Sequence, residues 1–134
     1  MKESSIKRYY FILFICVEKF IQHVFVTFAF AYDLSDIRSD VVVDYRILLY
    51  SGFIVAWFFL YAGYGIYQQK IWGLNLLWFL GWFDFIGEHI AQGGSLNFTP
   101  LSYIMAIIII IIIPLHKRTM KKKNELSESI DLKD

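Results

Sequence analysis

Long apolar runs, separated by short polar segments, set the pattern of this chain. A bilayer hydrocarbon core about 30 Å thick is crossed by about 20 helical residues, so runs of this length predict membrane-spanning helices. The second run contains no formally charged residue, and the fourth includes an unbroken series of isoleucines. The pattern predicts four helices, over residues 9–32, 47–67, 71–92 and 98–116.

These runs predict an all-α integral membrane protein with four transmembrane helices, crossing the cell membrane several times. Of the 134 residues, 57% are hydrophobic, against roughly 45–50% in soluble domains. A soluble domain this small could not bury four such runs, and the alternating pattern of a membrane β-barrel is absent from the sequence. The single cysteine, Cys16, excludes an internal disulfide. Residues 1–116 are thus expected to form one transmembrane domain.

The distribution of positive charge predicts how the helices are oriented. Lysine and arginine near the ends of spans mark the cytoplasmic side of a membrane. They gather in the N-terminal tail, at Lys70 and in the stretch Lys117–Lys123, whereas the connection 33–46 holds two arginines among four aspartates. We therefore expect the N-terminus and the C-terminus to be cytoplasmic, with the connections 33–46 and 93–97 outside. The pattern leaves open whether residues 33–46 include a short interfacial helix.

The segment 117–134 is basic at its start and polar afterwards, which predicts a disordered cytoplasmic tail. Its basic part, Lys117–Lys123, is expected to lie against anionic lipid headgroups. No nucleic-acid partner is expected, because membrane topology already accounts for these lysines. Pro114, near the end of the fourth run, is expected to help end that helix.

Small residues predict where helices approach closely in lipid. Gly52 and Ala56 lie four apart on the second helix, and Gly81 and Gly87 are candidates on the third. The fourth helix has a nearly uniform isoleucine surface, so we expect it to face lipid over most of its length.

Two helices carry nearly all the polarity within the predicted spans, and this makes them the candidate site. Residues four apart share one face of a helix, which groups these side chains into polar stripes. The polar residues are Glu18, Lys19, Gln22 and His23 on the first helix, and Asp84, Glu88, His89 and Gln92 on the third.

The depths of these residues in the membrane match. At about 1.5 Å per residue, His23 lies about 21 Å from the start of the first helix, and Asp84 about 20 Å from the start of the third, which runs in the same direction. Lys19 is within one turn of this level. A central unpaired Asp or Lys costs about 2.5–3.5 kcal/mol on the insertion scale. We therefore expect the first and third helices to face each other, with Lys19 paired to Asp84 or Glu18.

One interpretation is a proton- or small-cation-coupled transporter or channel-like subunit, because intramembrane acids mark such pathways. Asp84 and Glu88 would exchange protons, Glu18 would be the next station, and His23 and His89 could relay them. Four helices are few for a translocation path, so a homodimer is expected with this interpretation.

Two other interpretations remain open. In the first, the chain is a structural or interaction protein whose polar cluster only binds its helices together. In the second, it is a membrane enzyme or cofactor protein. His23 and His89 could ligate haem b or, with Glu88, a metal ion, and Glu88 could act as acid or base on a lipid-like substrate. The sequence identifies no cofactor and assigns no catalytic residue.

Overall fold

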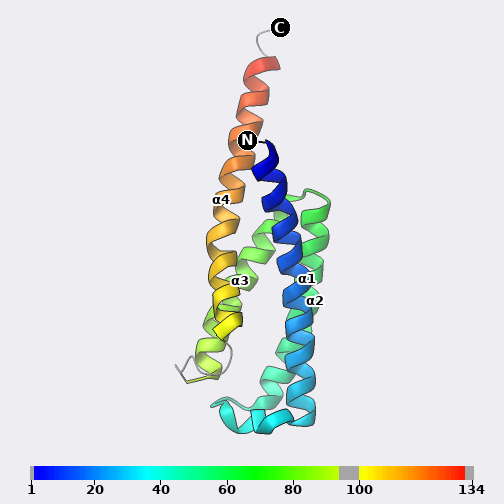
Figure 1. Cartoon of the computed structure of the whole chain (residues 1–134), viewed down its shortest axis with the longest axis vertical. Helices are drawn as coiled ribbons and strands as arrows, with labels where there is room; N and C mark the ends of the chain where they lie inside the picture. Colours follow the sequence, from blue (N-terminus) through cyan, green and yellow to red (C-terminus); the bar gives the residue numbers. More distant parts are fainter. Residues whose placement is uncertain (1, 94–99, 132–134) are drawn as a thin grey trace.

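Four long helices lie side by side along one axis and form a bundle (Figure 1). The computed structural model describes the backbone of residues 2–93 and 100–131, and the side chains of residues 6–93 and 101–121. No strand occurs within these ranges. The elements are α1 (Lys2–Tyr32), the 3-10 segment η1 (Leu34–Asp40), α2 (Tyr45–Tyr67), α3 (Ile71–Ala91) and α4 (Pro100–Asp131).

Three of the helices contain segments long and apolar enough to cross a membrane. α3 has 21 residues, but it is not among them, because Asn75, Asp84 and Glu88 lower its hydropathy. The protein is therefore all-helical, within the described ranges, and compatible with a membrane protein. The three segments are Ile6–Tyr32, Tyr45–Tyr67 and Leu101–Lys121.

The predicted helix boundaries hold to within two residues except at the two ends of the chain. α1 begins at Lys2 rather than at residue 9, and α4 continues to Asp131 rather than ending at residue 116. Pro114 lies inside α4. It removes one backbone hydrogen bond and crowds the carbonyl of Ile110, but the helix continues past it, so the expectation that Pro114 helps end this helix is wrong. The lysines and methionine that follow favour continued helix. The stretch 117–131 thus has helical backbone in place of the expected disordered tail, and residues 132–134 lie outside the described part.

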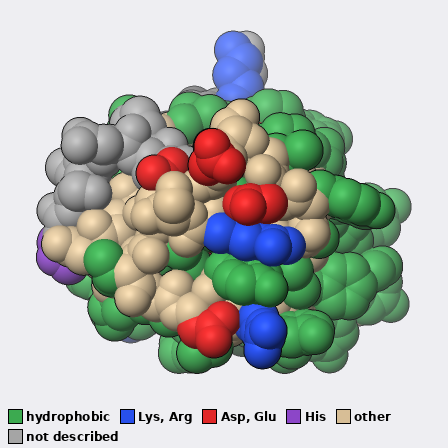
Figure 2. All heavy atoms as spheres, turned by 90° about the horizontal axis from the view of Figure 1, so that it is seen from below, with side chains coloured by type: hydrophobic (Ala, Val, Ile, Leu, Met, Phe, Trp, Pro, Cys, Tyr) green, Lys and Arg blue, Asp and Glu red, His purple; other side chains and the backbone are tan. Residues whose placement is uncertain are grey.

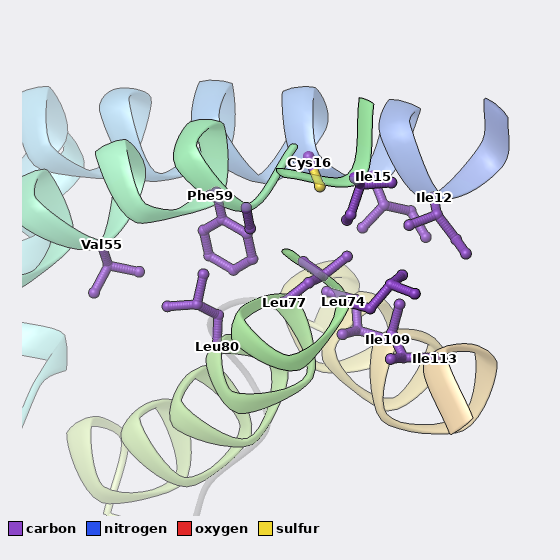
Figure 3. Close-up of a cluster of buried hydrophobic side chains, with 12 residues drawn as sticks. Ile12, Ile15, Cys16, Val55, Phe59, Leu74, Leu77, Leu80, Ile109 and Ile113 are labelled. Carbon is purple, nitrogen blue, oxygen red and sulfur yellow. The ribbon is translucent and has the colours of Figure 1, made fainter. Parts of the chain in front are cut away.

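The main core lies where all four helices meet, and Figure 3 shows its side chains. Phe59 of α2 is fully buried there, close to Leu77 and Leu80 of α3. Ile109 and Ile113 of α4 are also fully buried, so one stripe of α4 packs against the other helices. Leu101, Ile104 and Ile111 on its other faces are exposed, and their contact with lipid stays a prediction. The remaining core residues are Ile12, Ile15, Cys16, Val55, Ala62, Ile66 and Leu74.

Glycines allow the closest helix contacts, at one predicted and one unpredicted position. A Cβ on Gly81, which was predicted, would lie 2.6 Å from Ile109. A Cβ on Gly73, which was not predicted, would lie 2.6 Å from the backbone nitrogen of Ile66, so α2 and α3 touch through backbone at their shared hairpin. No described residue lies within 4 Å of a Cβ on Gly87, so the contact predicted there is absent from this part of the chain.

The segment between α1 and α2 closes the end of the bundle opposite the termini (Figure 1). It includes η1, so part of the 33–46 connection is a short helix. Arg38 holds this end together: its guanidinium donates to the Phe30 carbonyl at 2.9 Å and the Ala31 carbonyl at 2.8 Å, in the last turn of α1. Figure 2 shows acidic and basic side chains side by side at this end. In the connection between α3 and α4, which was predicted over residues 93–97, Gly93 takes φ +60. Residues 94–97 of this connection lie outside the described part.

At the opposite end, the basic part of α4 is tied to its neighbours. Arg8 of α1 donates to Thr119 at 3.1 Å, and Lys117 donates to Asn75 of α3. The lipid contact predicted for Lys117–Lys123 stays a prediction, and the side chains of residues 122 and 123 lie outside the described part.

Candidate functional site

Asp84 is the centre of a buried polar network. It lies two-thirds of the way along α3 and is 4% exposed, while Lys19 of α1 is 0% exposed. The Lys19 ammonium is 2.9 Å from Asp84 Oδ2. The predicted pairing across the first and third helices is therefore confirmed, and the long Lys19 side chain spans the difference of about one helical turn in depth between the two residues.

A third helix joins the network through Ser102. Lys19 Nζ donates to Ser102 Oγ at 2.9 Å and to its backbone carbonyl at 3.4 Å. An ammonium has three hydrogens, and Asp84 with these two oxygens supplies three acceptors. Sequence reasoning missed Ser102, which is a small hydroxyl in the first turns of α4. The available signal was that a polar group within a span needs an internal partner.

His23 completes the contacts of Asp84. Its Nε2 is 3.1 Å from Oδ1 and 3.3 Å from Oδ2 of Asp84. A carboxylate only accepts hydrogen bonds, so this geometry assigns the hydrogen to Nε2. The ring stacks on Phe59 of α2, with centroids 5.4 Å apart. One network therefore connects α1, α3 and α4, and rests against α2.

The charges of this network balance within it. Lys19 and Asp84 neutralise each other, and both lie almost entirely out of reach of solvent. Removing one member of such a pair is strongly destabilising, because the other charge is left buried and unpaired. Both carboxylate oxygens of Asp84 therefore have partners within the protein.

The other predicted residues of α3 form separate contacts. Gln92 Nε2 donates to Glu88 Oε2 at 3.2 Å, and His89 Nδ1 is 2.9 Å from the Tyr103 hydroxyl of α4. The two histidines proposed as haem or metal ligands thus each have one ring nitrogen within hydrogen-bond distance of another side chain, His23 with Asp84 and His89 with Tyr103. Within the described ranges, no three His, Cys, Asp or Glu side chains come together in a way that could hold a metal ion.

Glu18 and Gln22 differ from all of these. Glu18 Oε2 and Gln22 Oε1 are buried and have no hydrogen-bond partner among the residues that the structure describes. Both side chains lie in a groove of about 400 Å³ on the outer face of α1. The ionisable neighbours of Glu18 are Lys19 and His23 on its own helix and Asp84 on α3. The groove is lined by Phe14, Val17, Glu18, Ile21, Gln22 and Phe25.

The seven predicted site residues therefore separate into three groups. Lys19, His23 and Asp84 form one network, Glu88 and His89 bind partners near the end of α3, and Glu18 and Gln22 face outward. Comparisons with protein-family models, with curated proteins and with solved structures find no match for this chain.

Proposed function

We propose that this chain is a multi-pass membrane protein that takes up and releases a proton or a small cation at Glu18, as part of a transport-related assembly. The observation that carries the proposal is the buried carboxylate oxygen of Glu18, which has no hydrogen-bond donor. Buried polar atoms in native proteins nearly always have partners, so this oxygen needs a partner that the described residues do not supply. A proton or a cation is the smallest partner that satisfies a carboxylate.

The arrangement of the neighbouring charges supports this choice. Lys19 is the nearest cation on α1, but its three hydrogens already have acceptors in Asp84 and Ser102. Asp84 accepts from both Lys19 and His23. Glu18 is thus left as the acid whose ionised form nothing within the described part of the chain compensates by a direct contact. It takes the exchange role first considered for Asp84 and Glu88.

We propose four spans, with α3 as the fourth, and both termini in the cytoplasm. Asp84 is paired, so the charge that lowers the hydropathy of α3 does not prevent its insertion. The termini lie toward the same end of the bundle (Figure 1), and the lysine-rich segments lie at that end. Single cysteines at Ser39 and Thr119 in a Cys16→Ala background test this topology. An impermeant thiol reagent applied to intact cells should label position 39 only; labelling of position 119 alone would reverse the orientation.

For the network around Asp84 the geometry favours a structural role instead. Its donors and acceptors are matched within the protein, as expected of polar contacts that bind membrane helices together. This second role is compatible with the first, because the two use different carboxylates.

Proton flux in liposomes tests the proposal. The full chain is reconstituted in liposomes that hold a pH-sensitive dye. A pH gradient is then imposed across the liposome membrane, with sodium or potassium on the side opposite the excess protons. Wild type should dissipate the gradient faster than empty liposomes, and Glu18→Gln should fall to the empty-liposome rate. Asp40→Asn, the same acid-to-amide change at an exposed position of η1, is the matched control and should keep the wild-type rate.

Two outcomes would reject this assignment. A wild-type rate equal to that of empty liposomes would remove the transport role. A wild-type rate in Glu18→Gln, with loss in Glu88→Gln, would move the exchange site to the end of α3.

A further inference from the structure

The outer face of α1 carries large exposed side chains at the spacing of a helix-pairing seam. With Glu18 at an a position of a heptad, residues 11, 25 and 32 are the other a positions, and residues 14, 21 and 28 are d positions. Every one of these except Glu18 is an exposed, large hydrophobic side chain. They are Phe11, Phe14, Ile21, Phe25, Phe28 and Tyr32.

Apolar exposure alone would carry no inference, since lipid tails are as apolar as these side chains. Lipid cannot satisfy the polar atoms at this seam, those of Glu18 at an a position and of Gln22 at the flanking e position. Glu18 Oε2 and Gln22 Oε1 are buried among the apolar side chains and lack donors within the described structure. Hydrocarbon offers no hydrogen-bond donor at this depth. The donor must therefore come from a proton, a cation or another polypeptide.

A second copy of this chain fits this arrangement. In a two-fold symmetric pair of parallel helices, residues at a positions meet their own counterparts, so the two Glu18 side chains face each other. Gln22 lies at the neighbouring e position, where its amide flanks the seam and can both donate and accept a hydrogen bond. Two ionised Glu18 side chains would repel, but they can share a proton or hold one cation between them. A single polar residue at an a position is also a known means of fixing the register of paired helices.

We propose that α1 pairs in parallel with α1 of a second copy along this heptad seam, and that the two Glu18 carboxyls together form the proton or small-cation site. The axis of the pair is normal to the membrane, because both copies have the same orientation. The ion-binding half of this inference rests on the proposed function, whereas the pairing rests on the seam and its unpartnered polar atoms.

Cysteine cross-linking of the full chain in lipid vesicles tests the pairing. In the Cys16→Ala background, Ile21→Cys puts a thiol at a d position, where parallel partners lie close enough for a disulfide. Phe28→Cys, at the next d position, repeats the test should the first variant fold poorly. Phe79→Cys is the control, since Phe79 is equally exposed, at 62% against 59% for Ile21, but lies on α3.

Rapid cross-linking at 21 and 28, without cross-linking at 79, is the expected result. Cross-linking at 79 alone, or at none of the three positions, would overturn the pairing.

The flux assay separates this inference from the proposed function. Glu18→Gln should keep the cross-link, because an amide also pairs with itself, while losing flux. Flux that depends on Glu18 in the absence of any cross-link would reject the pairing and leave the function standing. A cross-link with flux that ignores Glu18 would reject the ion-binding half and leave the pairing standing.

Discussion

The ion pair between Lys19 and Asp84 gives the sharpest prediction for stability. Lys19→Met removes the ammonium and keeps an unbranched apolar chain of similar length, which leaves Asp84 with His23 as its donor. Asp84→Leu removes the carboxylate and leaves a lysine that is 0% exposed with only the two oxygens of Ser102. The double variant has an apolar contact in place of the pair.

The expected magnitudes follow from the geometry. At 2.9 Å and an effective dielectric constant of about 20, the attraction is roughly 6 kcal/mol, and desolvation offsets much of it. Breaking a buried pair by removing one partner costs about 3–5 kcal/mol, whereas replacing both partners by apolar groups is often close to neutral. Each single variant should therefore lose about 3–5 kcal/mol of unfolding free energy, and the double variant should lose less than either.

Reversible unfolding in mixed micelles, with detergent replaced stepwise by a denaturing detergent, measures the four free energies of this double-mutant cycle. The coupling energy should clearly exceed about 0.6 kcal/mol, the average of interhelical hydrogen bonds in a membrane protein. Single variants whose losses add in the double variant would refute the claim that the pair locks α1 to α3.

Three further predictions concern other contacts. Gly73→Ala should reduce thermal stability severely, because its Cβ would meet backbone atoms at 2.6–2.8 Å. Gly87→Ala adds a Cβ where the described residues leave open space, so it should raise the unfolding free energy by up to about 1 kcal/mol. Equal effects of the two changes would contradict the close approach of α2 and α3. Tyr103→Phe removes one hydrogen bond to His89 and should cost about 0.5–1.5 kcal/mol in the same assay; a loss as large as that of the ion pair would give this contact a greater role. Arg38→Ala removes two donors from the last turn of α1 and should speed backbone amide exchange there, but not in α4; unchanged exchange would show that the cap is dispensable.

Helix positions were predictable because each helix is dominated by a long apolar run bounded by polar residues. The start of α1 and the end of α4 were not predictable, because the length of an apolar run does not show how far a helix continues into the polar residues beside it. In the case of α4, the residues after Pro114 are good helix formers, and their propensity extends the helix to Asp131.

The link between Lys19 and Asp84 was predictable from depth alone, since both helices run in one direction and buried charges need partners. Ser102 was not predicted, because pairing in depth gives no information on which face of α4 turns inward. Glu18 was predicted as a site residue, but the sequence could not separate its role from that of Asp84. That separation required knowing that Lys19 and His23 donate to Asp84 and not to Glu18.

The most direct test of this account compares Asp84→Asn and Glu18→Gln in one experiment. Both changes convert an acid within a long apolar helix to its amide, and only the contacts differ. Thermal unfolding of the full chain in mild detergent should show a large loss for Asp84→Asn and an unchanged or raised midpoint for Glu18→Gln, since charges held at functional sites often cost stability. A large loss in Glu18→Gln together with a stable Asp84→Asn would contradict the division between a structural and a functional carboxylate.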